Sequence, residues 1–139
     1  RVYVQTACPD HPAIQFASRH DFQGFVQTEL PIREAHLSPP YTHLVRIILR
    51  GEHEPVLQVQ SESLGRLLRS EAKHSTEPIR ILGPAPCQVT RLHGNFRYHL
   101  QMCCIELQPL LDLWRRTATQ FSLPEGVELA IDVDPINLR

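Results

Sequence analysis

The segment YTHLVRIILR at residues 41–50 gives the clearest indication of the fold. Successive side chains of an extended chain point to opposite faces, so an alternating apolar pattern is typical of a half-buried β-strand. One face of this stretch carries Tyr41, Val45, Ile47 and Leu49. Two prolines, Pro39 and Pro40, stand directly before it and stop a helix. The sequence therefore predicts that a new domain begins at residue 39 with a strand over residues 41–50.

More elements follow this strand at regular intervals. They are a helix over 52–74, a short strand over 79–82 closed by GPAP at 83–86, a strand over 96–106, a helix over 109–121 and a last strand over 127–133. The order β-α-β-β-α-β is that of ferredoxin-like α+β domains. In that arrangement the first and third strands are central, the fourth lies beside the first, and both helices cover one face of the sheet. The other face stays open to solvent or to a partner.

The residues before the two prolines follow a different pattern. Residues 1–6 are β-prone, a break follows at CPDHP, residues 8–12, and a helix is expected over 13–36 with an interruption near Asp21. Pro31 argues against one continuous helix. The chain begins with Arg rather than Met, and we expect it to be a fragment of a longer protein. Residues 1–38 would be the end of one domain, and residues 39–139 would form another.

The composition is that of an ordinary globular chain of 139 residues, with 42% hydrophobic and 21% charged side chains. The formal net charge of −1 excludes a general basic field, so nucleic-acid binding would need a local patch. The four cysteines include no CxxC pair, and a zinc site in this chain is not expected. The sequence has no signal peptide and no long apolar run, so no membrane attachment is expected.

Basic side chains gather on the face of the predicted sheet that the helices leave open. They are Arg46 and Arg50 in the first strand, and Arg97 and His99 in the third. Arg91 lies in the approach to the third strand. The last strand brings Glu128 and Asp132 to the same face, where they could pair with the two arginines of the first strand. Two interpretations therefore stay open: a binding face for DNA or a partner, and a solvated face of exposed ion pairs.

No motif in the sequence points to a catalytic site. It contains no glycine-rich phosphate loop with lysine, no HExxH helix and no GxSxG turn. The eight histidines are scattered. Asp132 and Asp134 form a DxD pair, which either holds a divalent ion or caps the end of a strand before Pro135. We expect no catalytic residue and no metal ligand in this chain, and a small enzyme that uses these groups stays an alternative.

Six motifs in series resemble one known family. They are RVYVQT with DHP at 1–12, DF, F, EL and R between 21 and 33, PPY at 39–41, LGPAP at 82–86, RLHGNFRY at 91–98 and IDVDPINL at 131–138. In this order the motifs resemble the C-terminal end of the PriA family of primosomal replication-restart DNA helicases. The resemblance covers nearly the whole chain. It implies that residues 1–38 are the last strand and helix of a helicase motor and that residues 39–139 are the C-terminal domain, which resembles a small-subunit ribosomal protein.

The resemblance also implies a function. It implies a cytoplasmic bacterial protein of the primosome that restarts DNA replication at stalled forks. The full-length family unwinds DNA in the 3′ to 5′ direction with ATP and Mg²⁺, and it carries an inserted zinc-binding element. Those motifs are absent from this chain, so no cofactor is expected in it. The implied partners are forked or single-stranded DNA, primosome proteins and the single-strand DNA-binding protein, SSB. The alternative is a stand-alone ferredoxin-like interaction module without a motor.

The element at 91–98 and the residue after it give the candidate site. In the family, an arginine after the glycine and a glutamine after the aromatic residue help to form the pocket for the acidic C-terminal tail of SSB. This sequence has Asn95 and His99 at those positions. The expected DNA- or partner-binding residues are Arg91, Arg97, Tyr98, His99, Arg46 and Arg50.

Overall fold

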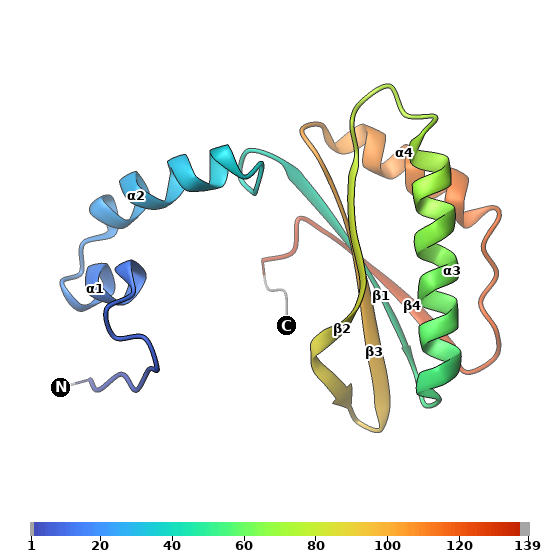
Figure 1. Cartoon of the computed structure of the whole chain (residues 1–139), viewed down its shortest axis with the longest axis horizontal. Helices are drawn as coiled ribbons and strands as arrows, with labels where there is room; N and C mark the ends of the chain where they lie inside the picture. The colour runs from blue at the N-terminus through green and yellow to red at the C-terminus, as the bar shows by residue number, and fades with distance from the viewer. Residues whose placement is uncertain (1, 137–139) are drawn as a thin grey trace. The chain divides into compact units, whose positions relative to one another are not determined.

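The computed structural model describes residues 2–136, and the chain divides into two units, Arg1–Ser38 and Pro39–Arg139. The second unit contains β1 (His43–Gly51), α3 (Glu54–Ala72), β2 (Arg80–Leu92), β3 (Asn95–Cys104), α4 (Leu107–Ala118) and β4 (Val127–Val133). Its strands form one antiparallel sheet in the order β2-β3-β1-β4 (Figure 1). The α+β class is confirmed, and β1 and β3 are the central strands, as the sequence predicted.

The hydrophobic core lies between the sheet and the two helices α3 and α4, which cover the same face (Figure 1). The apolar face of β1 supplies Val45, Ile47 and Leu49, as its alternating pattern predicted. The other core side chains with no exposed surface are Leu57, Leu64, Leu68, Leu100, Met102, Leu110 and Leu113. We call this side of the sheet the helix-covered face and the opposite side the outer face.

Strand β2 is much longer than the sequence predicted. The prediction ended it at residue 82, but it runs from Arg80 to Leu92 and includes both prolines of GPAP. Its pairing with β3 shifts register between Leu82 and Ala85 and again between Pro86 and Arg91. Proline is tolerated at bulges and on edge strands, where its missing N–H is not needed for the ladder. The second shift pushes Cys87 out of the regular ladder, and this bulge shapes the outer face.

A two-residue turn joins β2 to β3. Its central residues, His93 and Gly94, have φ angles of 49° and 88°. Positive φ at both positions is typical of the tight hairpin turns whose twist matches that of the flanking strands. The paired strands therefore continue to the hairpin tip, where Leu92 pairs with Asn95.

The first unit consists of two helices, α1 (Pro12–Ser18) and α2 (Phe22–Ala35). The break near residue 21 is confirmed, because Asp21 caps α2 by accepting a hydrogen bond from Gly24 N. Residues 2–6 form no strand, so that prediction is wrong for this structure. Helix α2 passes through Pro31, where the lost hydrogen bond leaves a carbonyl on an exposed surface. Neither helix has a buried residue.

No helix within the described residues is both long enough and apolar enough to cross a membrane.

Candidate nucleic-acid and partner interface

The strand register decides which candidate residues lie together on the outer face. Across β1 and β3, Arg50 pairs with Arg97 and Ile48 pairs with His99. Across β1 and β4, Arg50 pairs with Glu128. Directly opposed residues of paired strands point to the same face. Arg50 therefore lies between Arg97 on one side and Glu128 on the other.

Arg46 is buried, and the prediction that it stands on an open face is wrong. Its relative exposure is 1%. Its Nε and Nη2 atoms lie 3.2 and 3.0 Å from Nδ1 of His99, and Nη2 lies 3.7 Å from Sγ of Cys87. The β2 bulge brings Cys87, itself 2% exposed, over this part of the outer face. Arg46 therefore holds β1, β3 and the bulge together and does not reach the surface.

His99 is half-buried, and its Nδ1 faces the two nitrogens of Arg46. The pKa of His99 is lowered by burial first, and then by the positive charges of Arg46 and Arg97. A neutral imidazole that accepts at Nδ1 carries its proton at Nε2. His99 thus acts as a hydrogen-bond acceptor for a buried arginine, and it offers no positive charge to DNA.

The outer face is also closed at the start of β1. Thr42 and Leu44 are each 6% exposed. Both line a cavity of about 290 Å³ together with Pro40, Asp134 and Pro135. The prolines that flank the strands thus border this end of the outer face. The open part of the face is restricted to the other end, near Arg50 and Arg97.

Arg50 forms the cross-strand ion pair that the sequence suggested. Its guanidinium contacts the Glu128 carboxylate through Nε and Nη2. The two side chains are 56% and 65% exposed, so solvent screens the pair, which contributes about 0–1 kcal/mol to stability. The register also sets Asp132 opposite Arg46, but Arg46 turns toward His99 and Cys87. The solvated-face interpretation therefore describes Arg50 in this structure.

Arg97 carries the least compensated charge on the outer face. It is half-buried and stands opposite Arg50, a like charge. Within residues 2–136, its side chain has no hydrogen bond and no ion pair. A partly desolvated guanidinium without an acidic neighbour attracts carboxylates and phosphates, which its planar fork binds through two parallel hydrogen bonds. Arg97 is therefore the residue of this face that is best suited to contact an anion.

Arg91 and Tyr98 lie away from the outer face. Arg91 pairs with Phe96, which belongs to the helix-covered face, and its guanidinium carbon lies 5.2 Å from the centre of the Phe96 ring. This geometry is that of a cation–π contact. Tyr98 is 9% exposed, and its hydroxyl contacts Oε1 of Glu54 at 3.4 Å. Burial and then the Glu54 charge raise the pKa of Tyr98. The structure thus brings Arg50, Arg97 and His99 together and separates Arg91 and Tyr98 from them.

A cavity of about 490 Å³ opens beside Arg50 at the end of the sheet. Asn95 and His53 line it together with the acidic residues Glu52, Glu125 and Glu128. With more carboxylates than arginines on its walls, this cavity repels anions. An acidic peptide or a phosphate is therefore favoured on the Arg97 side of Arg50 and disfavoured on the Asn95 side.

The second residue of the DxD pair, Asp134, links the end of β4 to the start of β1. Oδ1 of Asp134 accepts a hydrogen bond from Leu44 N at 2.9 Å, and Oδ2 lies 2.8 Å from Nδ1 of His43. Burial alone would raise the pKa of Asp134, but the hydrogen bonds from Leu44 N and His43 outweigh it, and the pKa is lowered. No cluster of three or more potential metal ligands forms within residues 2–136. Asp134 thus fastens the end of β4 to the start of β1.

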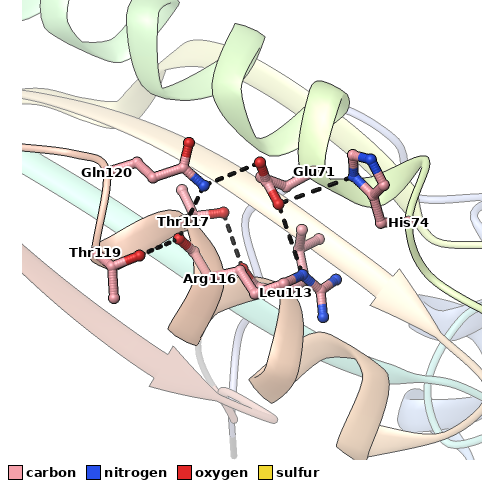
Figure 2. Close-up of polar contacts among 7 residues, drawn as sticks. All are labelled: Glu71, His74, Leu113, Arg116, Thr117, Thr119 and Gln120. Carbon is pink, nitrogen blue, oxygen red and sulfur yellow. Dashed lines mark hydrogen bonds and ion pairs between the residues drawn. The ribbon is translucent and has the colours of Figure 1, made fainter.

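A polar cluster that the sequence did not reveal ties the C-terminal ends of α3 and α4 together. Figure 2 shows Glu71 of α3 between His74 and the α4 side of the cluster. Its carboxylate lies 3.6 Å from Nε of Arg116 and accepts a hydrogen bond of 2.9 Å from Gln120, just after α4 (Figure 2). Because the residues of this cluster come from distant segments, no spacing in the sequence predicted the cluster. The cluster engages Arg116 on the helix side of the sheet, away from Arg97.

Comparison with known proteins identifies the family. Residues 33–136 match the family model described as the primosomal protein N C-terminal domain, PriA_C. The replication restart protein PriA of Treponema pallidum is 29% identical over 137 residues, which are 99% of this chain and 20% of that protein. PriA of Synechocystis is 32% identical over 139 residues, which are 99% of this chain and 16% of that protein. Among solved structures, the de novo designed protein Foldit4 has a TM-score of 0.48 at 13% identity, over 69% of this chain and 99% of that chain.

The chain therefore spans a fifth or less of the length of these two PriA relatives. The family model covers the whole sheet and both of its helices, from β1 to β4. The resemblance read from the motifs is confirmed, and the chain belongs to the PriA C-terminal domain family.

Proposed function

We propose that this chain is the DNA- and partner-binding end of a replication-restart primosomal helicase. The whole protein would unwind forked or single-stranded DNA in the 3′ to 5′ direction with ATP, in the bacterial cytoplasm. The sequence lacks a phosphate-binding loop, and residues 2–136 gather no group of metal ligands. In this proposal ATP, Mg²⁺ and Zn²⁺ belong to the motor, and the part of this chain is to hold DNA and partners.

We also propose that residues 39–139 form a ferredoxin-like, ribosomal-protein-like domain and that residues 1–38 are the end of the motor. The strand order β2-β3-β1-β4 supports the first statement. The exposed apolar side chains of the first unit support the second, because Tyr3 is 85% exposed and Phe22 is 74% exposed. A unit of this size with no buried helical residue needs another surface to pack on.

Limited proteolysis tests this division. We expect cleavage between residues 31 and 40 and a stable product that contains β1 to β4. A stable product that begins at residue 1 and ends within the later strands would contradict the division.

The observation that carries the DNA-binding proposal is the uncompensated guanidinium of Arg97 beside Arg50. Both lie at the open end of the outer face, and Arg50 is held by an exposed ion pair that a phosphate could replace. The net charge of −1 supplies no general attraction. Binding would therefore be weak and strongly dependent on salt, since it would depend on the few phosphates that these arginines contact.

Charge reversal at two matched arginines tests the proposal. Arg97→Glu should weaken binding of the chain to labelled forked DNA in a fluorescence-anisotropy titration and should flatten the salt dependence. Arg115→Glu, at an exposed position on α4, changes the net charge equally and should have little effect. If both variants bind forked DNA as tightly as the parent at low salt, the outer face is not the DNA surface.

For the SSB partner that the family suggests, the charges favour the Arg97 side. An acidic tail would meet Arg97 and Arg50 there, whereas Glu52 and Glu125 repel it beside Asn95. An acidic peptide should therefore compete with DNA for the chain, and Arg97→Glu should weaken both. If DNA does not displace the bound peptide, the peptide binds at a different surface.

A further inference from the structure

Among residues 2–136, strand β4 forms a free, regular edge of the sheet, and the opposite edge is irregular. At the other edge, β2 is interrupted by Pro84, Pro86 and two shifts of register. Prolines and bulges of this kind prevent another strand from pairing. Strand β4 (Val127–Val133) pairs with β1 without a register shift, and it contains no proline. One edge of the sheet is thus blocked, whereas the other can pair with a further strand.

The backbone groups on the free edge can be assigned from the register. Asp134 N donates to Leu44 O at 2.7 Å, so this opposed pair is hydrogen-bonded. Hydrogen-bonded and non-hydrogen-bonded pairs alternate along an antiparallel ladder. The even-numbered residues of β4 therefore bond to β1, and Leu129, Ile131 and Val133 direct their N–H and C=O groups outward. None of these three has a hydrogen-bond partner on that side within residues 2–136.

The two rows of side chains beside this edge differ in character. On the helix-covered face the edge presents Leu129, Ile131 and Val133, of which the last two are 39% and 41% exposed. On the outer face it presents Glu128 and Asp132. An added strand would place its side chains alternately against the apolar row and against the acidic row. It would need apolar residues at every second position and basic residues between them.

We propose that the β4 edge binds an extended segment of a partner protein in which basic and apolar residues alternate. A second copy of this chain is a poor occupant, because antiparallel pairing about Ala130 would set Glu128 opposite Asp132 of the other copy. The acidic row also repels nucleic acid. The edge is distinct from the Arg97 site, since β1 lies between β4 and β3. The two surfaces share Glu128, which pairs with Arg50, but the peptide test below uses no DNA and its outcome does not depend on DNA binding.

The probe for the test is a fluorescein-labelled peptide, acetyl-Lys-Val-Lys-Val-Lys-Val-Lys-amide, which is added to the full chain. We expect saturable binding in fluorescence anisotropy. Amide hydrogen exchange should slow at Leu129, Ile131 and Val133. The amides of Ala130 and Asp132, which already bond to β1, serve as controls within the same strand and should change little. Slowing confined to other strands would overturn the proposal.

Two further comparisons separate strand pairing from nonspecific attraction. Methylation of the backbone nitrogens of one alternate set of peptide residues should abolish binding, whereas methylation of the other set should not. Asp132→Lys should weaken binding about fivefold, because it replaces a favourable cross-strand charge pair by a repulsive one. Glu62→Lys, on the exposed side of α3, is the control for net charge. Equal binding of both methylated peptides, equal effects of both lysine variants, or dimerisation through β4 without peptide would each refute the proposal.

Discussion

Removal of the carboxylate that holds Arg50 should increase DNA affinity. In the structure Glu128 neutralises Arg50 across β1 and β4, while Arg97 on the other side of Arg50 has no acidic partner within residues 2–136. Glu128→Gln keeps the size of the side chain and one acceptor oxygen but removes its charge. Arg50 would then be free to join Arg97 at a phosphate of the bound DNA.

The magnitude follows from the exposure of the pair. Because Arg50 and Glu128 are 56% and 65% exposed, loss of their ion pair should lower the free energy of unfolding by about 0–1 kcal/mol. One additional phosphate contact steepens the slope of log K against log salt by about 0.9. If the variant and the parent bind DNA equally at 1 M salt, the variant should then bind about eightfold more tightly than the parent at 0.1 M salt. The variant should thus gain affinity with almost no change in stability.

The assay is a fluorescence-anisotropy titration of labelled forked DNA at several salt concentrations. Asp112→Asn is the matched control, because it removes the carboxylate that contacts Arg115 at 2.8 Å on α4 and changes the net charge equally. We expect a steeper salt slope for Glu128→Gln and the parent slope for Asp112→Asn. Equal gains in both variants would show that only the overall charge matters, and no gain in either would refute a role for Arg50.

Two other predictions concern the structure that supports the outer face. Gly83→Ala should destabilise the chain by about 2 kcal/mol or more in urea unfolding, because a Cβ would lie 2.7 Å from His99 O at a φ of 89°. Gly126→Ala, at a φ of 79° with open space around it, should cost only the conformational part, about 1 kcal/mol. The lowered pKa of His99 should make stability fall as pH drops below about 6.5, the value in an unfolded chain, because the unfolded state then takes up a proton that the folded state resists. His99→Gln keeps an acceptor for Arg46 and should reduce this loss between pH 7.5 and 5.5, whereas an unchanged pH dependence would exclude His99 as its source.

Alternation along single strands carried most of the correct fold prediction. The buried face of β1 was assigned correctly because Val45, Ile47 and Leu49 lie at alternate positions, and the predicted bounds of β4 agree with Val127–Val133. Strand β2 was cut short because Gly83 and Pro84 are ordinary signals for a turn. In the structure the bulge and the edge position accommodate them, which depends on the pairing with β3 and not on local preference.

The candidate site was predicted only in part, for a related reason. Alternation gave the correct face for Arg46, Arg50 and Arg97, and strand order gave the Arg50 and Glu128 pair. The burial of Arg46 depends on Cys87, which reaches the outer face only because the β2 bulge adds residues there. No periodic pattern in a sequence reports which loop covers which face. The free β4 edge was likewise visible only after the register was known.

Binding of DNA at the open end of the outer face can be followed at the arginine side chains themselves. The chain is labelled with ¹⁵N, and the Nε–Hε signals are followed by NMR while forked DNA is added at low salt. We predict that the signal of Arg97 shifts and saturates, that the signal of Arg50 shifts with it only in the Glu128→Gln variant, and that those of Arg66 and Arg115 on α3 and α4 stay in place. Shifts confined to the helix arginines, with Arg97 unchanged, would show that DNA does not bind at the outer face.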